Sequence, residues 1–206
     1  HWCITAPMTP NDSDAFNPKN VDTTTPHWER ACIAKMDQGQ PEAFTTLVNY
    51  YSKRIYAHLY RMTHNREEAE DLTQEAFVRA YRNIKSYDRT RPFRNWLYTI
   101  ATNTARNASR ARGRRIPSAR EDQNTEETII DHRAKHTHET RDLKEQLAEA
   151  ITHLPDPLPL LIQLHYQEGF TLREAAQMLE MNESAAKVAL HRARKTLRTI
   201  LKKDER

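Results

Sequence analysis

The sequence predicts an all-α protein with two small helical domains joined by a flexible linker. Only 3 of the 206 residues are glycine, which disfavours turn-rich β architectures. Residues with high helix propensity are abundant throughout the chain. Apolar residues recur at steps of three and four in two long stretches, as on one face of a helix. Between these stretches the periodicity is lost, so each stretch is predicted to form its own modest core.

The first helical domain is predicted over residues 28–115. Residues 1–27 precede it; they are rich in Pro, Asn, Asp and Thr and are expected to form a disordered leader. Two helices are expected at 41–63 and 67–84. Their buried faces carry Phe44, Leu47, Val48, Tyr51, Ile55, Leu59 and Met62 in the first, and Ala69, Leu72, Ala76, Phe77, Ala80, Tyr81 and Ile84 in the second.

A third helix is expected at 93–115, after a break in the segment SYDRTRP. Pro92 disfavours helical geometry in the residue before it, which accounts for the break. The third helix is aromatic at its start and cationic at its end. From Lys85 to Arg115 there are nine basic residues and one acidic residue. Such a basic block favours a polyanion as partner, although a solvated helix face is the simpler alternative.

Residues 116–140 show no helical stripe and are predicted to form the linker. Three histidines in it, His132, His136 and His138, could bind a metal, but a polar linker explains them better. Cys3 and Cys32 match neither a disulfide framework nor a metal-ligand spacing. A redox or zinc role is the less favoured alternative, because His1 and Cys3 are close in the sequence. We therefore expect no cofactor and no metal site.

The second domain is predicted over residues 141–206. A helix from Arg141 should end before the PDP segment, and a short helix at 158–169 should end at Gly169. Thr171 and Glu174 form a capping-box pattern for a helix at 172–179, and Asn182 can cap the next helix. Two helices at this spacing form a helix-turn-helix. Its core is expected to contain Phe170, Ala175, Ala176, Leu179, Met181, Ala186, Leu190 and Ala193.

An outward stripe remains on the second helix of this motif. Helical spacing places on one face Ser184, Lys187, Val188, His191, Arg192 and Lys195. The face combines charge, hydrogen-bond donors and one apolar contact, as reading of the DNA major groove requires. Phosphate contacts are expected from Arg194, Lys195 and Arg198. A solvated basic helix is the alternative, which the capping box and the turn spacing disfavour.

Three motifs together resemble the bacterial sigma-70-type sigma factors. They are DLTQEAFVRAYRNIKSYD, FRNWLYTIATNTARN and LPDPLPLLIQLHYQEGFTLREAAQMLEMNESAAKVALHRARKTLR. They are most similar to the small extracytoplasmic-function (ECF) group, which keeps the second and fourth conserved regions. The resemblance covers roughly Trp28 to Lys203 without the linker. It implies a region 2 helical bundle and a region 4 helix-turn-helix in a subunit that directs core RNA polymerase to promoters.

The resemblance also implies roles for particular residues. A surface that docks on the β′ clamp helices of the polymerase is matched by Asp71, Gln74, Glu75 and Val78; the β subunit is a further expected partner. Binding of the −10 element is implied for Ser86, Tyr87, Arg89, Arg91, Asn103, Arg106, Asn107 and Arg110. The loop at 86–93 matches the segment that captures a flipped base. Trp96 is expected to pack in the core.

Region 4 is implied to read the −35 element through Ser184, Lys187, Val188, His191, Arg192 and Lys195. The sequence departs from the family here. Glu180 occupies a turn position that is usually Gly, and Ala185, Val188 and Ala189 replace frequent Thr, Ser and Arg. These departures affect the expected −35 sequence more than the fold.

Two other functions are less consistent with the sequence. A plain helix-turn-helix regulator would not need the basic third helix or its DLTQE neighbour. An enzyme is disfavoured because carboxylate clusters, Gly-rich phosphate loops and nucleophile motifs are missing from the sequence. No apolar run approaches the roughly 20 residues of a membrane span, so we expect a cytoplasmic protein without membrane insertion. By resemblance, an anti-sigma factor is an expected partner.

Overall fold

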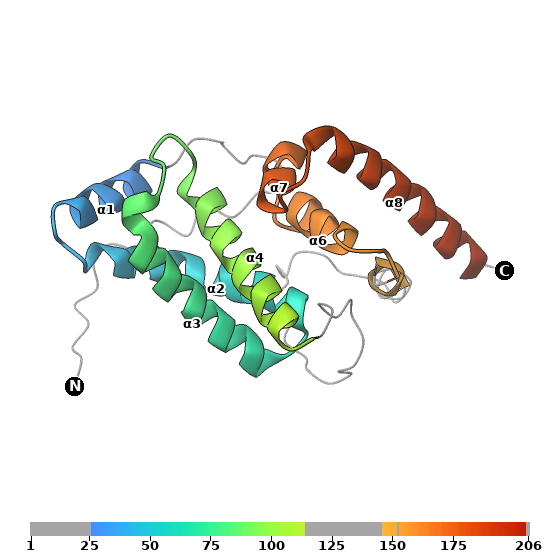
Figure 1. Ribbon diagram of the computed structural model, residues 1–206, viewed down its shortest axis with the longest axis horizontal. Helices are drawn as coiled ribbons and strands as arrows, with labels where there is room; N and C mark the ends of the chain where they lie inside the picture. The colour runs from blue at the N-terminus through green and yellow to red at the C-terminus, as the bar shows by residue number, and fades with distance from the viewer. Residues whose placement is uncertain (1–25, 114–145, 152, 205–206) are drawn as a thin grey trace, which may run out of the picture.

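The structure, a computed structural model, describes residues 26–113, 146–151 and 153–204. All regular secondary structure within these residues is helical, which confirms the predicted all-α class (Figure 1). The predicted leader lies outside the described residues except for its last two positions. The predicted linker lies outside them entirely.

Four helices form the N-terminal bundle: α1 (His27–Asp37), α2 (Ala43–Thr63), α3 (Arg66–Asn83) and α4 (Phe93–Ala111). Their apolar faces meet in a core that includes Leu47, Ile55, Leu59, Ala69, Ala76, Ala80, Phe93, Leu97 and Ala101. The corner between α2 and α3 is made by His64, which has a φ of 51°. The Asn65 side chain then accepts the backbone N–H of Glu68 at 2.8 Å and caps α3.

Helix α1 is separated from α2 by a short turn over residues 38–42. Gly39 adopts a φ of 80° there, a conformation that residues with a side chain seldom adopt. Ile33 of α1 is 3% exposed and packs in the bundle core, while Trp28 packs edge-on against Tyr50 at 4.6 Å between ring centroids. These contacts fix α1 against the bundle.

The third predicted helix ends four residues earlier than expected. Helix α4 stops at Ala111, where Arg112 leaves helical geometry and Gly113 takes a φ of 64°. A glycine in the left-handed conformation is a frequent way to end a helix. Sequence periodicity did not reveal this stop because the cationic residues continue past it.

The C-terminal module contains a helical segment at 146–151, then α6 (Leu158–Ile162), the π-helical turn η2 (Gln163–Gln167), α7 (Leu172–Met178) and α8 (Glu183–Asp204). The single helix expected at 158–169 is thus an α-helical turn followed by a π-helical one. The N–H of Glu168 bonds the carbonyl of Gln163 at 3.0 Å, the five-residue spacing of a π-helix.

The capping box of the helix-turn-helix is confirmed. The Thr171 hydroxyl accepts the N–H of Glu174 at 3.2 Å, and the Glu174 carboxylate accepts the N–H of Thr171 at 2.8 Å. Asn182 accepts the N–H of Ser184 at 2.8 Å and caps α8 as predicted. The expected core is buried apart from Met181, which is half-buried.

The bundle and the C-terminal module contact each other directly, with α4 lying beside α7 (Figure 1). Their apolar residues form one continuous cluster. Tyr81, which was expected on a buried face, is 45% exposed. The Tyr81 ring lies edge-on to Phe44 at the rim of the bundle, so it covers the core with one edge and faces solvent with the rest.

Candidate nucleic-acid interface

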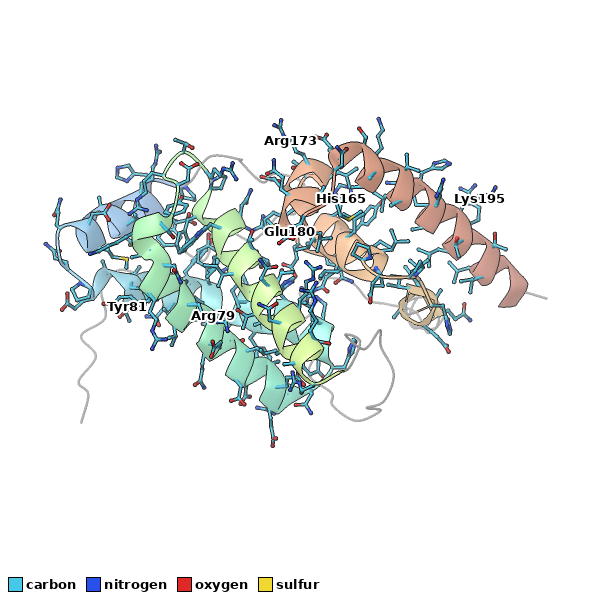
Figure 2. The ribbon with its side chains drawn as sticks, viewed as in Figure 1. Arg79, Tyr81, His165, Arg173, Glu180 and Lys195 are labelled. Atoms are coloured by element: carbon cyan, nitrogen blue, oxygen red, sulfur yellow. The ribbon has the colours of Figure 1, made fainter. Side chains whose placement is uncertain are left out.

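The predicted reading stripe lies on the outer face of α8. All six of its residues are exposed, whereas Ala186, Leu190 and Ala193 of the same helix are buried. Val188 is 50% exposed and gives the stripe an apolar part. Within the part of the chain that the structure describes, the stripe's cations form no ion pair. Figure 2 shows Lys195 pointing away from α6. The stripe is therefore free to meet a ligand.

The turn between α7 and α8 places Glu180 at a φ of 57°. This left-handed conformation explains why glycine is usual at the position, because a Cβ atom there costs about 1–2 kcal/mol. The turn nevertheless keeps its helix-turn-helix geometry, held by the Met181 N–H bonding the Ala176 carbonyl at 2.8 Å. The departure from the family pattern thus leaves the fold unchanged, as expected.

Arg194 is held differently from the cations of the α8 stripe. Its guanidinium donates to the hydroxyl of Tyr166, with 2.7 Å from Nε, and lies 5.6 Å from the centre of that ring. Tyr166 is itself 48% exposed and anchors Arg194 beside η2. Arg198 is exposed. To make the predicted phosphate contact, Arg194 would have to bind the phosphate while its guanidinium is held by Tyr166.

The connection between α3 and α4 begins with the 3-10 turn η1 (Ile84–Ser86) and continues to Pro92. Ser86 and Arg91 are exposed on it. Tyr87 is only 5% exposed, and its ring packs between Phe93 and Trp96 at 5.5 and 5.2 Å. The expected packing role of Trp96 agrees with these contacts. Tyr87 therefore supports the connection from inside rather than lining its surface.

Asp88 and Thr90 shape the tip of this connection. The Asp88 carboxylate accepts the backbone N–H of Thr90 at 3.0 Å and its hydroxyl at 2.7 Å. These hydrogen bonds lower the pKa of Asp88 below its usual value. Arg89 turns back onto the connection and bonds the Ile84 and Tyr87 carbonyls at 2.8 and 2.6 Å.

The polar residues predicted on α4 form a band that becomes more exposed toward its C-terminus. Asn103 and Arg106 are half-buried, and Asn107 and Arg110 are exposed. Arg112, at the end of the band, pairs with Glu68 of α3. The band continues from the α3–α4 connection, so the two predicted −10 segments are presented by consecutive parts of the same bundle.

The outer face of α3 carries the residues expected to bind polymerase. Asp71, Gln74, Glu75 and Val78 are all exposed, opposite the buried Leu72, Phe77 and Ala80. Val78 and Tyr81 are each 45% exposed, so the face has an apolar part that the sequence did not reveal for Tyr81. Glu75 pairs with Arg79 at 2.6 Å along the helix. Figure 2 marks Arg79 and Tyr81 on α3.

Comparison with known proteins agrees with this arrangement. Residues 47–115 match the family "Sigma-70 region 2", and residues 144–197 match "Sigma-70, region 4". The chain is 33% identical over 177 residues to the ECF RNA polymerase sigma factor SigW of Bacillus subtilis, covering 82% of this chain and 95% of the relative. The chain belongs to the ECF sigma factors. It is thus a transcription initiation factor without catalytic chemistry of its own.

Solved structures share the fold of this sigma factor. CnrH in complex with the cytosolic domain of CnrY has a TM-score of 0.60 at 24% identity, covering 86% of this chain and 99% of that chain. The sigma factor RpoE of Bartonella quintana, in complex with the anti-sigma factor NepR, has a TM-score of 0.58 at 24% identity. That match covers 77% of this chain and 96% of the other.

The sigma factor has a buried carboxylate between its two halves that the sequence did not single out. Glu168, which follows η2, is 5% exposed and receives hydrogen bonds from Arg61 and, at 2.9 Å, from Tyr98. Its backbone carbonyl accepts from Arg94, whose guanidinium lies 3.9 Å from the centre of the Phe170 ring. The polar residues come from α2 and α4, far away in the sequence. From the sequence alone, a charged residue directly before Gly169 is expected to be a solvent-exposed residue at a helix end.

The electrostatics keep Glu168 ionised in this position. Burial by itself would raise the pKa of its carboxyl, but the interactions with His58 and Arg61 outweigh burial and lower that pKa to about 2. His58 also bonds Gln163 of η2 at 3.0 Å, and Asn95 of α4 bonds Glu174 of α7 at 2.6 Å. Polar contacts thus link the two halves at several points of their junction.

Other kinds of site are missing from the described part of this sigma factor. Across residues 26–113, 146–151 and 153–204, no three His, Cys, Asp or Glu side chains gather as a metal would require. The linker histidines and Cys3 fall outside these ranges, and Cys32 is a half-buried free thiol. No helix in the same ranges is long and apolar enough to span a membrane.

Proposed function

We propose that this ECF sigma factor acts in the cytoplasm by binding core RNA polymerase and reading a promoter at two places. The α8 stripe reads the −35 element, and the α3–α4 connection with the α4 band binds the −10 element. The observation that carries this proposal is the stripe itself, which is exposed along its whole length on a helix whose other face is buried. A helix of this kind fits the DNA major groove.

The chemistry of the stripe suits duplex DNA. Lys187 and Arg192 supply donors for guanine edges or phosphates, and His191 adds a further donor. Val188, which is exposed, offers an apolar contact for a thymine methyl group. In our proposal Ser184, near the capped start of α8, contacts the edge of the same groove. Lys195, one turn beyond His191, extends the cationic surface toward the sugar-phosphate backbone.

The −10 surface suits separated strands. Its contact residues, in our proposal, are Ser86, Arg91, Asn103, Arg106, Asn107 and Arg110. Cationic and amide side chains of this kind bind the backbone and the unpaired edges of single-stranded DNA. Tyr87 and Arg89 contribute through the shape of the connection. Binding of the opened strand then favours melting of the promoter, because the duplex form cannot make the same contacts.

The α3 face is the proposed contact for the β′ clamp helices. Asp71, Gln74 and Glu75 give it polar and acidic character, and Val78 beside Tyr81 gives it an apolar centre. Apolar patches rimmed by polar residues are typical of protein-binding surfaces. The β subunit is the further proposed polymerase contact. The face lies on the side of α3 opposite the bundle core, so polymerase can bind it without unfolding the bundle.

An anti-sigma factor is the proposed regulatory partner. RpoE of Bartonella quintana is described in complex with the anti-sigma factor NepR, and CnrH with the cytosolic domain of CnrY. By analogy, a regulator of this sigma factor would cover the α3 face or the DNA-reading surfaces. The exposed Val78 and Tyr81 are the natural apolar anchors for such a protein, because large apolar side chains dominate interface energetics.

Reconstituted transcription tests this function. Purified core polymerase from a related bacterium is mixed with the full chain and genomic DNA fragments, and the transcript starts are mapped. We expect a set of new starts that share two upstream motifs. Starts identical to those of core polymerase alone would contradict the proposal. The mapped promoter then supplies the DNA for finer tests.

Replacement of Lys187 and Arg192 by Ala tests the −35 assignment. Loss of two phosphate or base contacts should lower affinity for a −35 duplex at least tenfold. The slope of log K against log salt concentration should become less steep by up to about 2. Affinity for core polymerase should stay unchanged because α8 is remote from α3. Lys53→Ala, which removes one exposed cation from α2, is the control. Loss of polymerase affinity in the double variant would refute this division of roles.

A further inference from the structure

Arg89 has an arrangement that its expected role in DNA binding does not explain. Its guanidinium donates to the carbonyls of Ile84 and Tyr87 at 2.8 and 2.6 Å, and to the carboxylate of Asp37 at 2.8 Å. The same group lies 5.0 Å from the centre of the Tyr87 ring. The planar, five-donor fork of arginine suits such a junction, because it can serve several acceptors in fixed directions at once.

The two carbonyls belong to the segment that begins the predicted −10 connection. Ile84 is the first residue of η1 and Tyr87 directly follows η1. Both of their carbonyls accept from the Arg89 guanidinium, and the Ile84 carbonyl also accepts the Tyr87 N–H at 3.2 Å. The Tyr87 hydroxyl in turn bonds the carbonyl of Arg91 at the far side of the connection. Arg89 thus holds the start of the connection at Ile84 and Tyr87, and the Tyr87 hydroxyl holds its end at Arg91.

Asp37 ties this junction to a helix outside the matched family segment. It is the last residue of α1, whereas the Sigma-70 region 2 match begins at residue 47. Helix α1 is itself docked by the buried Ile33 and by the bond from Tyr51 to Glu29. The Asp37 carboxylate therefore lies on a helix that is fixed to the bundle. It is 52 residues away from Arg89 in the sequence.

We propose that Arg89 and Asp37 are positioning residues for −10 recognition, with α1 acting as the support of the reading connection. Arg89 acts on the promoter through the shape of residues 84–91, and Asp37 sets the direction of its guanidinium. Ser86 and Arg91 are exposed on this connection, where the Ser86 hydroxyl donates to the Asn83 carbonyl at 2.8 Å and Arg91 pairs with Asp88 at 3.4 Å. This inference rests on the proposed −10 function of the connection and adds α1 to the machinery that performs it.

Positioning and direct contact predict opposite effects of removing Asp37. Functional groups must be held to within about 0.5 Å to work at full strength, so a loosened connection loses discrimination more than overall affinity. If Arg89 instead bound a phosphate, loss of the neighbouring carboxylate would strengthen DNA binding by removing a negative charge. An exposed ion pair adds little to global stability, so its loss leaves the bundle folded.

The test measures −10 discrimination by the holoenzyme. Full-length variants are assembled with core polymerase and bound to a mapped promoter fragment whose −10 segment is unpaired. Affinity is compared between the natural −10 segment and a scrambled one, over a range of salt concentrations. The variants are Asp37→Ala, Arg89→Ala and Arg89→Lys. Glu42→Ala is the matched control: it removes one exposed carboxylate that forms no ion pair among the described residues.

We expect Asp37→Ala and Arg89→Lys each to reduce −10 discrimination about three- to tenfold. Affinity for polymerase, affinity for the −35 duplex and the salt dependence should stay as in the wild type. Glu42→Ala should behave as the wild type throughout. Arg89→Lys is informative because lysine keeps the charge but loses the fork that holds two carbonyls and a carboxylate.

Three outcomes would overturn the inference. The first is tighter DNA binding by Asp37→Ala with unchanged discrimination. The second is a slope of log K against log salt concentration that becomes less steep by about 0.7 in Arg89→Ala and returns to the wild-type value in Arg89→Lys. This result would indicate a phosphate contact on single-stranded DNA. The third is loss of polymerase affinity or of thermal stability in Asp37→Ala, which indicates a role in the fold alone. A wild-type holoenzyme without −10 preference would instead refute the proposed function itself.

Discussion

Glu29 illustrates how one buried side chain can set the pH response of this sigma factor. It lies on α1 with 1% exposure, accepts a hydrogen bond from Tyr51, and keeps its other carboxylate oxygen without a partner in the described structure. Burial raises the pKa of its carboxyl to about 7, although the Tyr51 hydrogen bond and the charge of Arg94 act in the opposite direction.

This raised pKa predicts a loss of stability on going from acidic to neutral pH. The unfolded carboxyl releases its proton near pH 4.5, while the folded one keeps it until about pH 7, so the folded state binds more protons within this window. The free energy of unfolding should therefore fall by up to about 3 kcal/mol as pH rises through it. Glu29→Gln should remove this fall, since the amide stays neutral.

Urea unfolding at pH 4.5, 6 and 8 measures the effect. Glu70→Gln, which changes an exposed carboxylate on α3, is the control. Parallel pH profiles for Glu29→Gln and the wild type would contradict the assignment. Glu168 acts in a separate window: its pKa of about 2 contributes stability that is present above pH 4.5 and is lost as pH falls toward 2.

Helix α3 shows how one element serves two surfaces. Leu72, Phe77 and Ala80 bury one side of it in the bundle, and the proposed polymerase contact occupies the other. Helical periodicity separated these two sides in the sequence, because every third or fourth residue returns to the same face. It misplaced Tyr81, whose angular position lies at the border of the buried face and whose exposure depends on the neighbouring Phe44.

The α3 face yields a prediction at this scale. Replacing Asp71 and Gln74 by Ala should weaken binding to core polymerase about tenfold or more, because both side chains are exposed and make no contribution to the bundle core. The −35 duplex affinity of the free protein should not change. Fluorescence anisotropy with labelled sigma factor measures the first quantity and an electrophoretic shift the second.

Arg66→Ala is a suitable control for this pair, since it alters the first residue of the same helix without touching the proposed contact. Unchanged holoenzyme assembly by the double variant would refute the assignment of the α3 face. A drop in melting temperature without a specific loss of polymerase binding would indicate that the two residues serve the fold.

The whole molecule is held in its arrangement by the junction between the bundle and the C-terminal module. Glu168 is its electrostatic centre, and the Tyr98 and Phe170 rings pack edge to face beside it at 4.9 Å between centroids. A buried carboxylate of this kind is stable only while its partners remain, since an unpaired buried charge is costly. The junction therefore depends on a small number of residues.

Glu168→Gln should weaken this junction by about 3 kcal/mol, because the neutral amide loses the charge-assisted bond with Arg61. Spin labels at positions 82 on α3 and 198 on α8, in a chain with both cysteines changed to Ser, report the distance between the two halves. We expect one narrow distance distribution in the wild type and a broader, longer one in the variant. The control is Glu183→Gln, which changes an exposed carboxylate at the start of α8 and should leave the distribution unchanged. An unchanged distribution in Glu168→Gln would contradict the role of Glu168.

The sequence by itself determined helices α2, α3, α7 and α8, the capping box, the Asn182 cap and the two faces of α3 and α8. These features follow from residues close together in the chain, through hydrogen bonds within a turn and through the 3.6-residue period. The tertiary structure alone decided the stop of α4 at Ala111, the burial of Tyr87 and Glu168, and the bridge from Arg89 to Asp37. Arg61 and Glu168 are 107 residues apart, and no local pattern indicates that such partners will meet; only the packing of separate helices removes them from water.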